Sequence, residues 1–491
     1  MKKLLILLAA LIFITGSAAS GEDDYWPPLV EDDNDIWPAE YEYILNADGT
    51  AEITAYIGRD RVLTLPDEIE GYRVSGIGSA AFAGSRMLES VTLPEGITYL
   101  SDEAFQWCPS LVHVSLPSSL TGIGVNPFIR CGSLSTIDIS PDNPELFIQD
   151  GALCSRSDGR LIFYPRAAEA DSFDVPHGIK TIGQSAFEYC DRLKRVNFPD
   201  SLISIETHAF SFCSQLTEIK LNDGLEAIGD SAFWYCVSLR EVSLPASLTF
   251  IGANPFNACH GLEGVSVSPD NTALRVLDGV LYTSAMDRLI CRPCALSGDS
   301  FVIPDGVEVI GDCALRECEG LKHVTIPGGV TEIGSGAFLG CIGLSEIVLP
   351  ETVTEIGSGA FNYCQYVERI TLPKGITQIR DNTFEGCGHL AEIIVPESVI
   401  YIGECAFMDC PSLEDITLPQ GLEYIGDCAF EGCSGLKQLT LPESVQYISE
   451  LAFERCWSLE ELRVVQGSYA QAYCEEQGLN YVFAQEEPSG A

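Results

Sequence analysis

Cysteine shows the most regular chemical pattern in this sequence. Twenty cysteines occur, and thirteen of them, from Cys108 to Cys456, stand three residues after a bulky apolar residue that recurs mostly at intervals of 23. Cysteines in an exported protein normally pair as disulfides. Equivalent positions of stacked repeats, however, have parallel side chains, whereas a disulfide requires side chains that converge. We therefore predict that most of this column stays reduced and packs as small apolar residues.

The remaining candidate ligands and nucleophiles do not form a known catalytic or metal-binding motif. Cys291 and Cys294 form a single C-x-x-C pair, but zinc needs a second pair at suitable spacing. The pair also lies in an insertion rather than at a helix start, which disfavours a redox role. The six histidines have no metal-type spacing, and no nucleophile elbow, phosphate loop or H-E-x-x-H occurs. The stretches 140–143 and 268–271 could hold calcium, but turn conformations explain their Asp and Asn residues more simply. We expect no enzyme activity, no cofactor and no bound metal.

Positive charge is scarce, so a local group of cations is a candidate binding site. The chain has 27 Lys+Arg against 71 Asp+Glu, a net charge of −44, which disfavours nucleic acid as a partner. Four cations are expected on or beside the exposed face of three successive strands: Lys194, Arg195, Lys220 and Arg240. With strands about 5 Å apart, they could orient an acidic partner. Alternatively, Glu218 and Glu241 pair with them as surface ion pairs without function.

The elements that must position these residues follow from the 23-residue period. In the unit that begins at Leu111, Val114 and Leu116 alternate as in a half-buried strand, and Pro117 ends that strand. Gly124 permits a turn, and an Asp or Ser often follows this glycine, as do Asp230, Ser335 and Asp427, which predicts the N-cap of a short helical turn. One unit cannot bury its apolar side alone, so neighbouring units must stack into a solenoid. The repeating anchor stands at Phe82, Phe105, Phe128, Phe187, Phe210, Phe233, Phe256, Leu315, Phe338, Phe361, Phe384, Phe407, Phe430 and Phe453.

Two anchor separations of 59 instead of 23 reveal two insertions of 36 residues. The insertions are copies of one another, offset by 128 residues, and lie near 140–175 and 268–303. Their stretches Gly151 to Tyr164 and Gly279 to Arg292 predict β-hairpins.

The unit LxxVxLPxxLxxIGxxAFxxC resembles the BspA-type leucine-rich repeats of bacterial surface proteins, over about residues 40 to 484. The resemblance implies an α/β leucine-rich repeat solenoid with a parallel β-sheet on one face, two β-hairpin insertions and terminal caps. The commoner leucine-rich pattern places Asn or Cys after the strand, where this chain has Ser119, Gly375 or Gly421. The curvature of the commoner leucine-rich repeat solenoids is therefore not expected of this chain.

Segments outside the repeats complete the predicted organisation. Residues 1–19 read as a signal peptide, with Lys2 and Lys3 before a short apolar run and small residues up to Ala19. The alternative is a membrane anchor, for which the run is short. We expect a disordered acidic linker over 20–40, a β cap over 41–74, the solenoid over 75–465, a C-terminal cap over 466–484 and a disordered tail over 485–491.

These expectations favour a secreted, monomeric binding protein without a membrane span after signal cleavage. The resemblance implies an adhesin or a protein-interaction scaffold, with a host matrix or surface protein as ligand. The alternative is a carbohydrate-binding or envelope-structural solenoid. A row of exposed aromatic side chains would favour sugar binding, but the two outward columns of the predicted strands contain no aromatic residue other than histidine.

Overall fold

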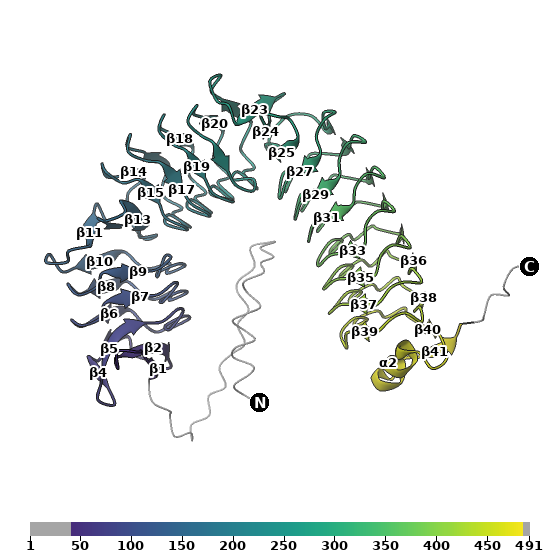
Figure 1. Cartoon of the computed structure of the whole chain (residues 1–491), viewed down its shortest axis with the longest axis horizontal. Helices are drawn as coiled ribbons and strands as arrows, with labels where there is room; N and C mark the ends of the chain where they lie inside the picture. The colour runs from purple at the N-terminus through teal and green to yellow at the C-terminus, as the bar shows by residue number, and fades with distance from the viewer. Residues whose placement is uncertain (1–40, 485–491) are drawn as a thin grey trace, which may run out of the picture. The chain divides into compact units, whose positions relative to one another are not determined.

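The computed structural model describes residues 41–484. The predicted signal peptide (1–19), acidic linker (20–40) and C-terminal tail (485–491) lie outside the described residues. Each coil of the described unit contributes two short strands, and the strands of successive coils line up as two rows (Figure 1). The predicted parallel solenoid is therefore confirmed, and a second row of strands accompanies the predicted one.

The first row contains the predicted strands. It comprises β3 (Val62–Thr64), β6 (Ser90–Thr92), β8 (His113–Leu116), β10 (Thr136–Ile139), β14 (Ser172–Asp174), β16 (Arg195–Asn197), β18 (Glu218–Lys220), β20 (Glu241–Leu244), β22 (Gly264–Val267), β26 (Ser300–Val302), β28 (His323–Thr325), β30 (Glu346–Val348), β32 (Arg369–Thr371), β34 (Glu392–Ile394), β36 (Asp415–Thr417), β38 (Gln438–Thr440) and β40 (Glu461–Val464). Neighbours pair in parallel, as β6 does with β8. The row is not one unbroken sheet, because pairing stops at β10 and at β22, where the insertions begin, and at three further places.

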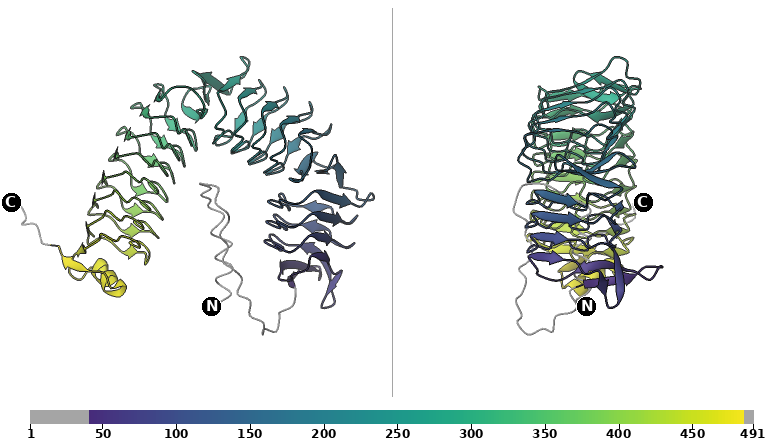
Figure 2. Two further views of the ribbon diagram at one scale, coloured as in Figure 1. Left: turned by 180° about the vertical axis from the view of Figure 1, so that it is seen from behind. Right: turned by 90° about the vertical axis from the view of Figure 1, so that its left-hand side faces the viewer.

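The second row follows the proline turn in each coil. It comprises β5 (Tyr72–Ile77), β7 (Tyr99–Leu100), β9 (Gly122–Ile123), β15 (Thr181–Ile182), β17 (Ser204–Ile205), β19 (Ala227–Ile228), β21 (Phe250–Ile251), β27 (Val309–Ile310), β29 (Glu332–Ile333), β31 (Glu355–Ile356), β33 (Gln378–Ile379), β35 (Tyr401–Ile402), β37 (Tyr424–Ile425) and β39 (Tyr447–Ile448). These strands also pair in parallel, and they lie on the inner side of the curve that the coils follow (Figures 1 and 2).

The core between the two rows consists of anchors and thiols that stack from coil to coil. Phe361 and Phe407 are 1% and 0% exposed, and the ring of Phe407 lies 5.4 Å from that of Phe384. Each column thiol points at the backbone of the preceding coil, as Cys364 Sγ donates to Phe338 O at 3.2 Å. The thiols therefore add a second hydrogen bond to carbonyl groups such as Phe338 O, which also accepts from Cys341 N at 3.0 Å, and this is a role beyond packing.

The segment that carries Ala-Phe is a tight turn, and the predicted helical turn is wrong. The residue two before the anchor has a positive φ in most coils, as in His208 (φ 56°) and Cys405 (φ 53°), which a helix does not allow. The acidic residue after the glycine instead caps the next coil, since Asp230 Oδ1 accepts a hydrogen bond from Ala253 N at 2.8 Å. The preference for Asp at this position thus reflects coil stacking rather than helix capping.

Both insertions form the predicted hairpins and divide the core. β12 (Ala152–Ser155) and β13 (Arg160–Phe163) pair antiparallel, as do β24 (Val280–Thr283) and β25 (Arg288–Cys291). An unpredicted strand precedes each hairpin, β11 (Leu146–Gln149) and β23 (Leu274–Leu277). Each hairpin then joins the second row, since β13 pairs with β15 and β25 with β27. Alternate hairpin residues face opposite ways, so the apolar interior consists of three clusters that meet at the insertions.

Caps close both ends of the described unit. At the N-terminal end, β1 (Tyr41–Leu45) pairs antiparallel with β2 (Ala51–Tyr56), and β4 (Glu68–Ile69) pairs with β5. At the other end, α2 (Tyr469–Gln477) is the one α-helix among residues 41–484, and β41 (Tyr481–Phe483) pairs with β40. Ser468 caps this helix by accepting from Gln471 N.

Candidate binding surface

The structure places the four predicted cations along the first row, where three of them form ion pairs. Lys194 Nζ lies 3.4 Å from Asp171 Oδ2, and Arg240 Nη1 lies 3.1 Å from Glu263 Oε1. Arg195 Nε lies 3.8 Å from Glu218 Oε2, the pairing that the sequence suggested. No ion pair of Lys220, and none between Glu241 and these cations, occurs within residues 41–484.

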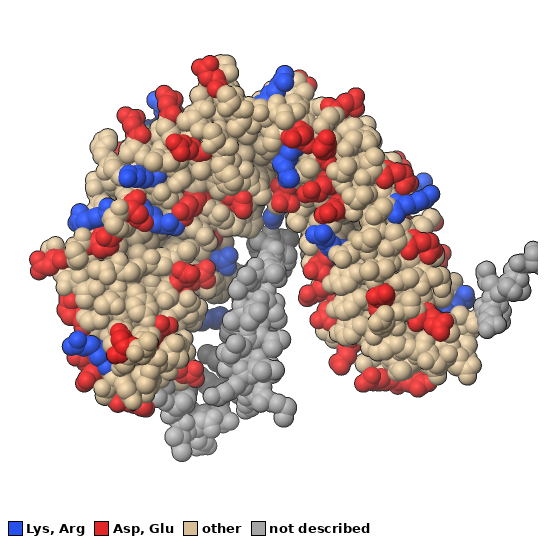
Figure 3. Space-filling model, viewed as in Figure 1, with Lys and Arg blue, Asp and Glu red and all other residues tan. Residues whose placement is uncertain are grey.

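The local positive charge is therefore largely cancelled. The paired side chains are 57–66% exposed, so each pair contributes only about 0–1 kcal/mol. On the face seen in Figure 3, Lys and Arg side chains lie among carboxylates rather than in one basic patch. Lys220 is the member of the group left to contact a partner, and the role of the four as a binding site stays a prediction.

A row of stacked tyrosines on the second row is the surface that sequence reasoning missed. Tyr401, Tyr424 and Tyr447 begin β35, β37 and β39, and their ring centroids lie 4.8 Å apart in both pairs, with planes 10° and 13° apart. The isoleucine that follows each tyrosine is buried, so the tyrosine projects outward. The phrase Tyr-Ile at a spacing of 23 was visible in the sequence, but the second row to which it belongs was not predicted.

Stacking decides which part of each tyrosine a partner can reach. The inward faces of the rings cover one another, and the ring edges with their hydroxyl groups remain accessible, most of all in Tyr447, which is 42% exposed. Within the described residues, none of the three hydroxyls donates a hydrogen bond to the protein. The row therefore offers phenol hydroxyls at the strand spacing, whereas a sugar ring would need an open aromatic face.

A second line of acidic residues runs beside the tyrosines. Asp381, Glu404 and Asp427 occupy the same position of successive coils, two residues after the buried isoleucine. Partial burial, with the charges of Asp381 and Asp427, raises the pKa of Glu404. Partial burial, then the neighbouring Asp381, also raises the pKa of Tyr401. Hydroxyl oxygens that can accept from N–H groups, together with closely spaced carboxylates, favour a cationic ligand.

A polar hollow of about 550 Å³ lies near the N-terminal cap and is a weaker candidate. Asn46, Asp48, Thr50, Ser75 and Tyr99 contribute to its lining. These side chains largely bind one another, since Asn46 Nδ2 donates to Thr50, Ser75 and Tyr99 at 3.2–3.3 Å. A ligand here would have to replace hydrogen bonds that already exist.

Residues 41–484 contain no group of three or more His, Cys, Asp or Glu side chains placed to hold a metal ion. No helix in this part of the chain is long and apolar enough to cross a membrane.

The chain is similar to known leucine-rich repeat proteins. The model of the BspA type leucine-rich repeat region matches residues 65–154, 160–276, 293–413 and 401–477. A leucine-rich repeat protein from Eubacterium ventriosum is 22% identical, with a TM-score of 0.51 over 85% of this chain and 93% of that one. A leucine-rich cell surface protein from Faecalibacterium prausnitzii is 26% identical, with a TM-score of 0.37 over 89% of this chain and 96% of that one. No curated protein sequence matches.

Proposed function

Since the chain belongs to the BspA type leucine-rich repeat family, we propose that it is a secreted adhesin whose tyrosine row binds a basic segment of a protein ligand. Families of this kind are repeat scaffolds, so the function belongs to an exposed surface rather than to a catalytic pocket. The proposed surface comprises Tyr401, Tyr424 and Tyr447 with Asp381, Glu404 and Asp427, hereafter the tyrosine surface.

The observation that carries the proposal is the set of three stacked, outward-facing tyrosines whose hydroxyls have no protein partner among the described residues. Rigid aromatic side chains are favoured contact residues because they add much contact area at little entropic cost. Packing against the neighbouring ring already fixes each tyrosine side chain. Binding would therefore cost little additional side-chain entropy. The adjacent carboxylates supply the charge that attracts Lys and Arg side chains.

The ligand class distinguishes this proposal from the carbohydrate-binding alternative. A sugar-binding platform would present open ring faces in a row, and here stacking covers both faces of Tyr424 and one face of each neighbouring ring. A protein segment can instead place guanidinium or ammonium groups against hydroxyls and carboxylates.

The test compares binding of the purified chain to immobilised extracellular-matrix proteins, to a Lys/Arg-rich peptide and to a Glu-rich peptide of equal length. We expect binding to the basic peptide and to at least one matrix protein, weakening as salt rises. Replacing the three tyrosines by Phe keeps the stack and removes the hydroxyls, and should weaken binding at least about tenfold, or about 1.4 kcal/mol.

A matched control replaces Ile394, Thr417 and Thr440 by Ala, on the first row of the same three coils. This control should bind as the unmodified chain does. Equal loss in both triple variants, or binding to neutral glycans but to no protein, would refute the assignment of the tyrosine surface.

A further inference from the structure

The second insertion interrupts the stacking of coils. Among residues 41–484, β22 pairs with β20 alone and β26 pairs with β28 alone, so no first-row pairing crosses the insertion. The second row continues from the insertion into the next coil, since β25 pairs with β27. The central apolar cluster also gives way to the C-terminal cluster at this place. Side-chain contacts between the coil before the insertion and the coil after it are therefore well placed to control how firmly the two clusters are joined.

One such contact is common to both insertions. Asn254 Nδ2 donates to Cys313 O at 2.6 Å, across the second insertion. The duplicate residue Asn126 donates in the same way to Ser185 O at 2.7 Å, across the first. Because both copies have this hydrogen bond, it belongs to the way an insertion is accommodated by the fold.

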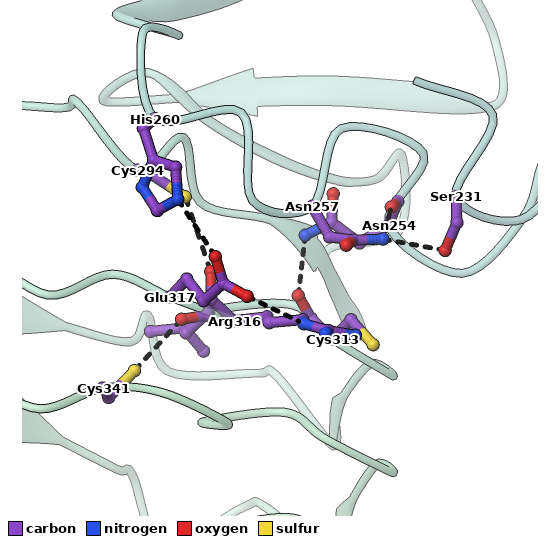
Figure 4. Close-up of polar contacts among 10 residues, drawn as sticks. Ser231, Asn254, Asn257, His260, Cys294, Cys313, Arg316, Glu317 and Cys341 are labelled. Atoms are coloured by element: carbon purple, nitrogen blue, oxygen red, sulfur yellow. Dashed lines mark hydrogen bonds and ion pairs between the residues drawn. The ribbon is translucent and has the colours of Figure 1, made fainter. Parts of the chain in front are cut away.

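A second contact occurs at the second insertion and has no counterpart at the first. His260 Nε2 lies 3.0 Å from Glu317 Oε2, and Figure 4 shows the two side chains pointing toward each other. The offset of 128 residues places Gly132 and Tyr189 at the equivalent positions of the first insertion. The duplicated backbone therefore folds without the His–Glu contact, which makes a role other than folding plausible on physical grounds.

The carboxylate of Glu317 is held in position from three sides. Its side chain is 19% exposed, and its Oε1 lies 3.4 Å from Arg316 Nε. The guanidinium of Arg316 in turn lies 5.0 Å from the ring centroid of Trp234. In the next coil, a Cβ atom at Gly340 would lie 2.9 Å from Glu317 Cγ, so glycine at that position leaves room for the Glu317 side chain. The carboxylate is thus fixed before His260 binds it.

The groups around His260 are mostly acidic or neutral. The His260 side chain is 34% exposed, so protons can reach it from solvent. Tyr235, from the preceding coil, packs against the imidazole edge-on with ring centroids 5.7 Å apart. Glu317, Cys318 and Glu319 face it from the coil after the insertion. A positive charge on the imidazole is therefore stabilised by the coil on the other side of the insertion.

The protonation equilibria of the two partners agree with this geometry. The hydrogen bond to Glu317 raises the pKa of His260, against the opposing effect of burial, and the charge of Glu319 adds to the rise. Burial acts to raise the pKa of Glu317, but the hydrogen bond from His260 and the charge of Arg316 outweigh it, and the pKa is lowered. Both shifts favour the charged pair.

We propose that His260 and Glu317 form a pH-sensitive contact that fastens the coil after the second insertion to the coil before it. A histidine whose pKa is raised on folding contributes stability that is fully present below its ordinary value of about 6.5, and that is lost as pH rises through the folded-state value. Arg316 keeps Glu317 ionised when His260 is neutral, so proton uptake by His260 alone changes the contact. Mild acid therefore joins the central and C-terminal clusters more firmly, and mild alkali loosens them.

The first test follows the titration of the histidine rings by NMR in the full chain with labelled histidine. His260→Gly assigns the resonance, and the duplicate insertion has glycine at this position, so the variant should fold. We expect the pKa of His260 to lie above about 6.5 and to fall in Glu317→Gln. His208, whose pKa is lowered by burial, should titrate below His260 in the same spectra. A His260 that titrates at or below about 6.5 and does not respond to Glu317→Gln overturns the proposal.

The second test measures opening at the insertion by hydrogen exchange, corrected for the intrinsic effect of pH on exchange. Raising the pH from about 6 to about 8.5 should increase opening of residues 252–263 and 311–322 at least about threefold, as expected of a partly exposed ion pair. Both His260→Gly and Glu317→Gln should remove this pH dependence, so misfolding of one variant leaves the other informative. The control His389→Ala changes an exposed histidine that stacks on Tyr366 and should keep it. The same pH dependence in folded His260→Gly as in the unmodified chain would overturn the proposal.

Discussion

Replacing Phe407 by Ala tests the register of the whole solenoid. The side chain is 0% exposed, and its ring lies 5.4 Å from Phe384 and 5.3 Å from Phe430. Removing a buried phenylalanine costs about 3–5 kcal/mol through lost burial and the remaining cavity. Each lost aromatic contact contributes about 0.5–1.5 kcal/mol of its own, so we expect the upper part of that range. Leu315 occupies an anchor position naturally, and Phe407→Leu should therefore cost less than Phe407→Ala.

The loss should be local, because each coil of a solenoid contacts only its neighbours. The apolar cluster that contains Phe407 spans Val280 to Cys474, whereas Phe105 belongs to the N-terminal cluster. Global unfolding of such a chain need not be two-state, so native-state hydrogen exchange is the suitable assay. Peptides around Phe407 should lose about 3–5 kcal/mol of opening free energy, and peptides around Phe105 none.

An exposed aromatic residue provides the control. Phe250 is 58% exposed, and Phe250→Ala should change stability by no more than about 0.5 kcal/mol. A loss below about 1 kcal/mol in Phe407→Ala, or an equal loss around Phe105, would refute the reasoning about register and cluster boundaries.

Four further predictions follow from the thiols, one partly buried carboxyl group and the cations. Thiol counting in denaturant without reductant should find at least about ten free groups, and fewer than four would contradict the parallel column. Cys364→Ala should cost about 0.5–1.5 kcal/mol, because Phe338 O loses one of two hydrogen bonds and keeps the one from Cys341 N, and a neutral result in denaturant titration would show that the thiol only packs. Burial raises the pKa of Glu188 from 4.5 to about 7, so stability should fall as pH rises across that range, and Glu188→Gln should remove this slope. Replacing the four predicted cations by Ser should lower stability by only about 0–1 kcal/mol per ion pair, and unchanged partner affinity and salt dependence would leave them a structural role alone.

Much of the fold was predictable because one spacing repeats along the chain. Apolar residues at a fixed position of each repeat predict the anchors, the first-row strands and the insertion hairpins. The pattern is weak in one repeat, but its recurrence along the chain makes the prediction strong. The second row was missed because a strand of two residues, such as Tyr424–Ile425, shows no alternation to detect. The helical turn was predicted wrongly for a related reason. An Asp before Ala-Phe has the sequence of an N-cap, but in Asp230 the carboxylate binds the backbone of the following coil, a partner that no local window includes.

Candidate sites were harder to predict because they depend on contacts between coils. Arg195 and Glu218 could be paired from sequence, since both belong to the same column of adjacent first-row strands and their register is 23. The surroundings of Cys294 could not be predicted, because an insertion resets the register and places this loop cysteine 3.4 Å from Arg316 O of the next coil. Cys291 and Cys294 are close in sequence, yet Cys291 faces the central core cluster and Cys294 packs against the C-terminal one. In a solenoid, contacts between side chains at equivalent positions of adjacent coils can therefore be predicted from the repeat alone. At an insertion the backbone is duplicated but the side chains differ, as Tyr164 and Arg292 do, so the contacts there cannot be predicted from the repeat.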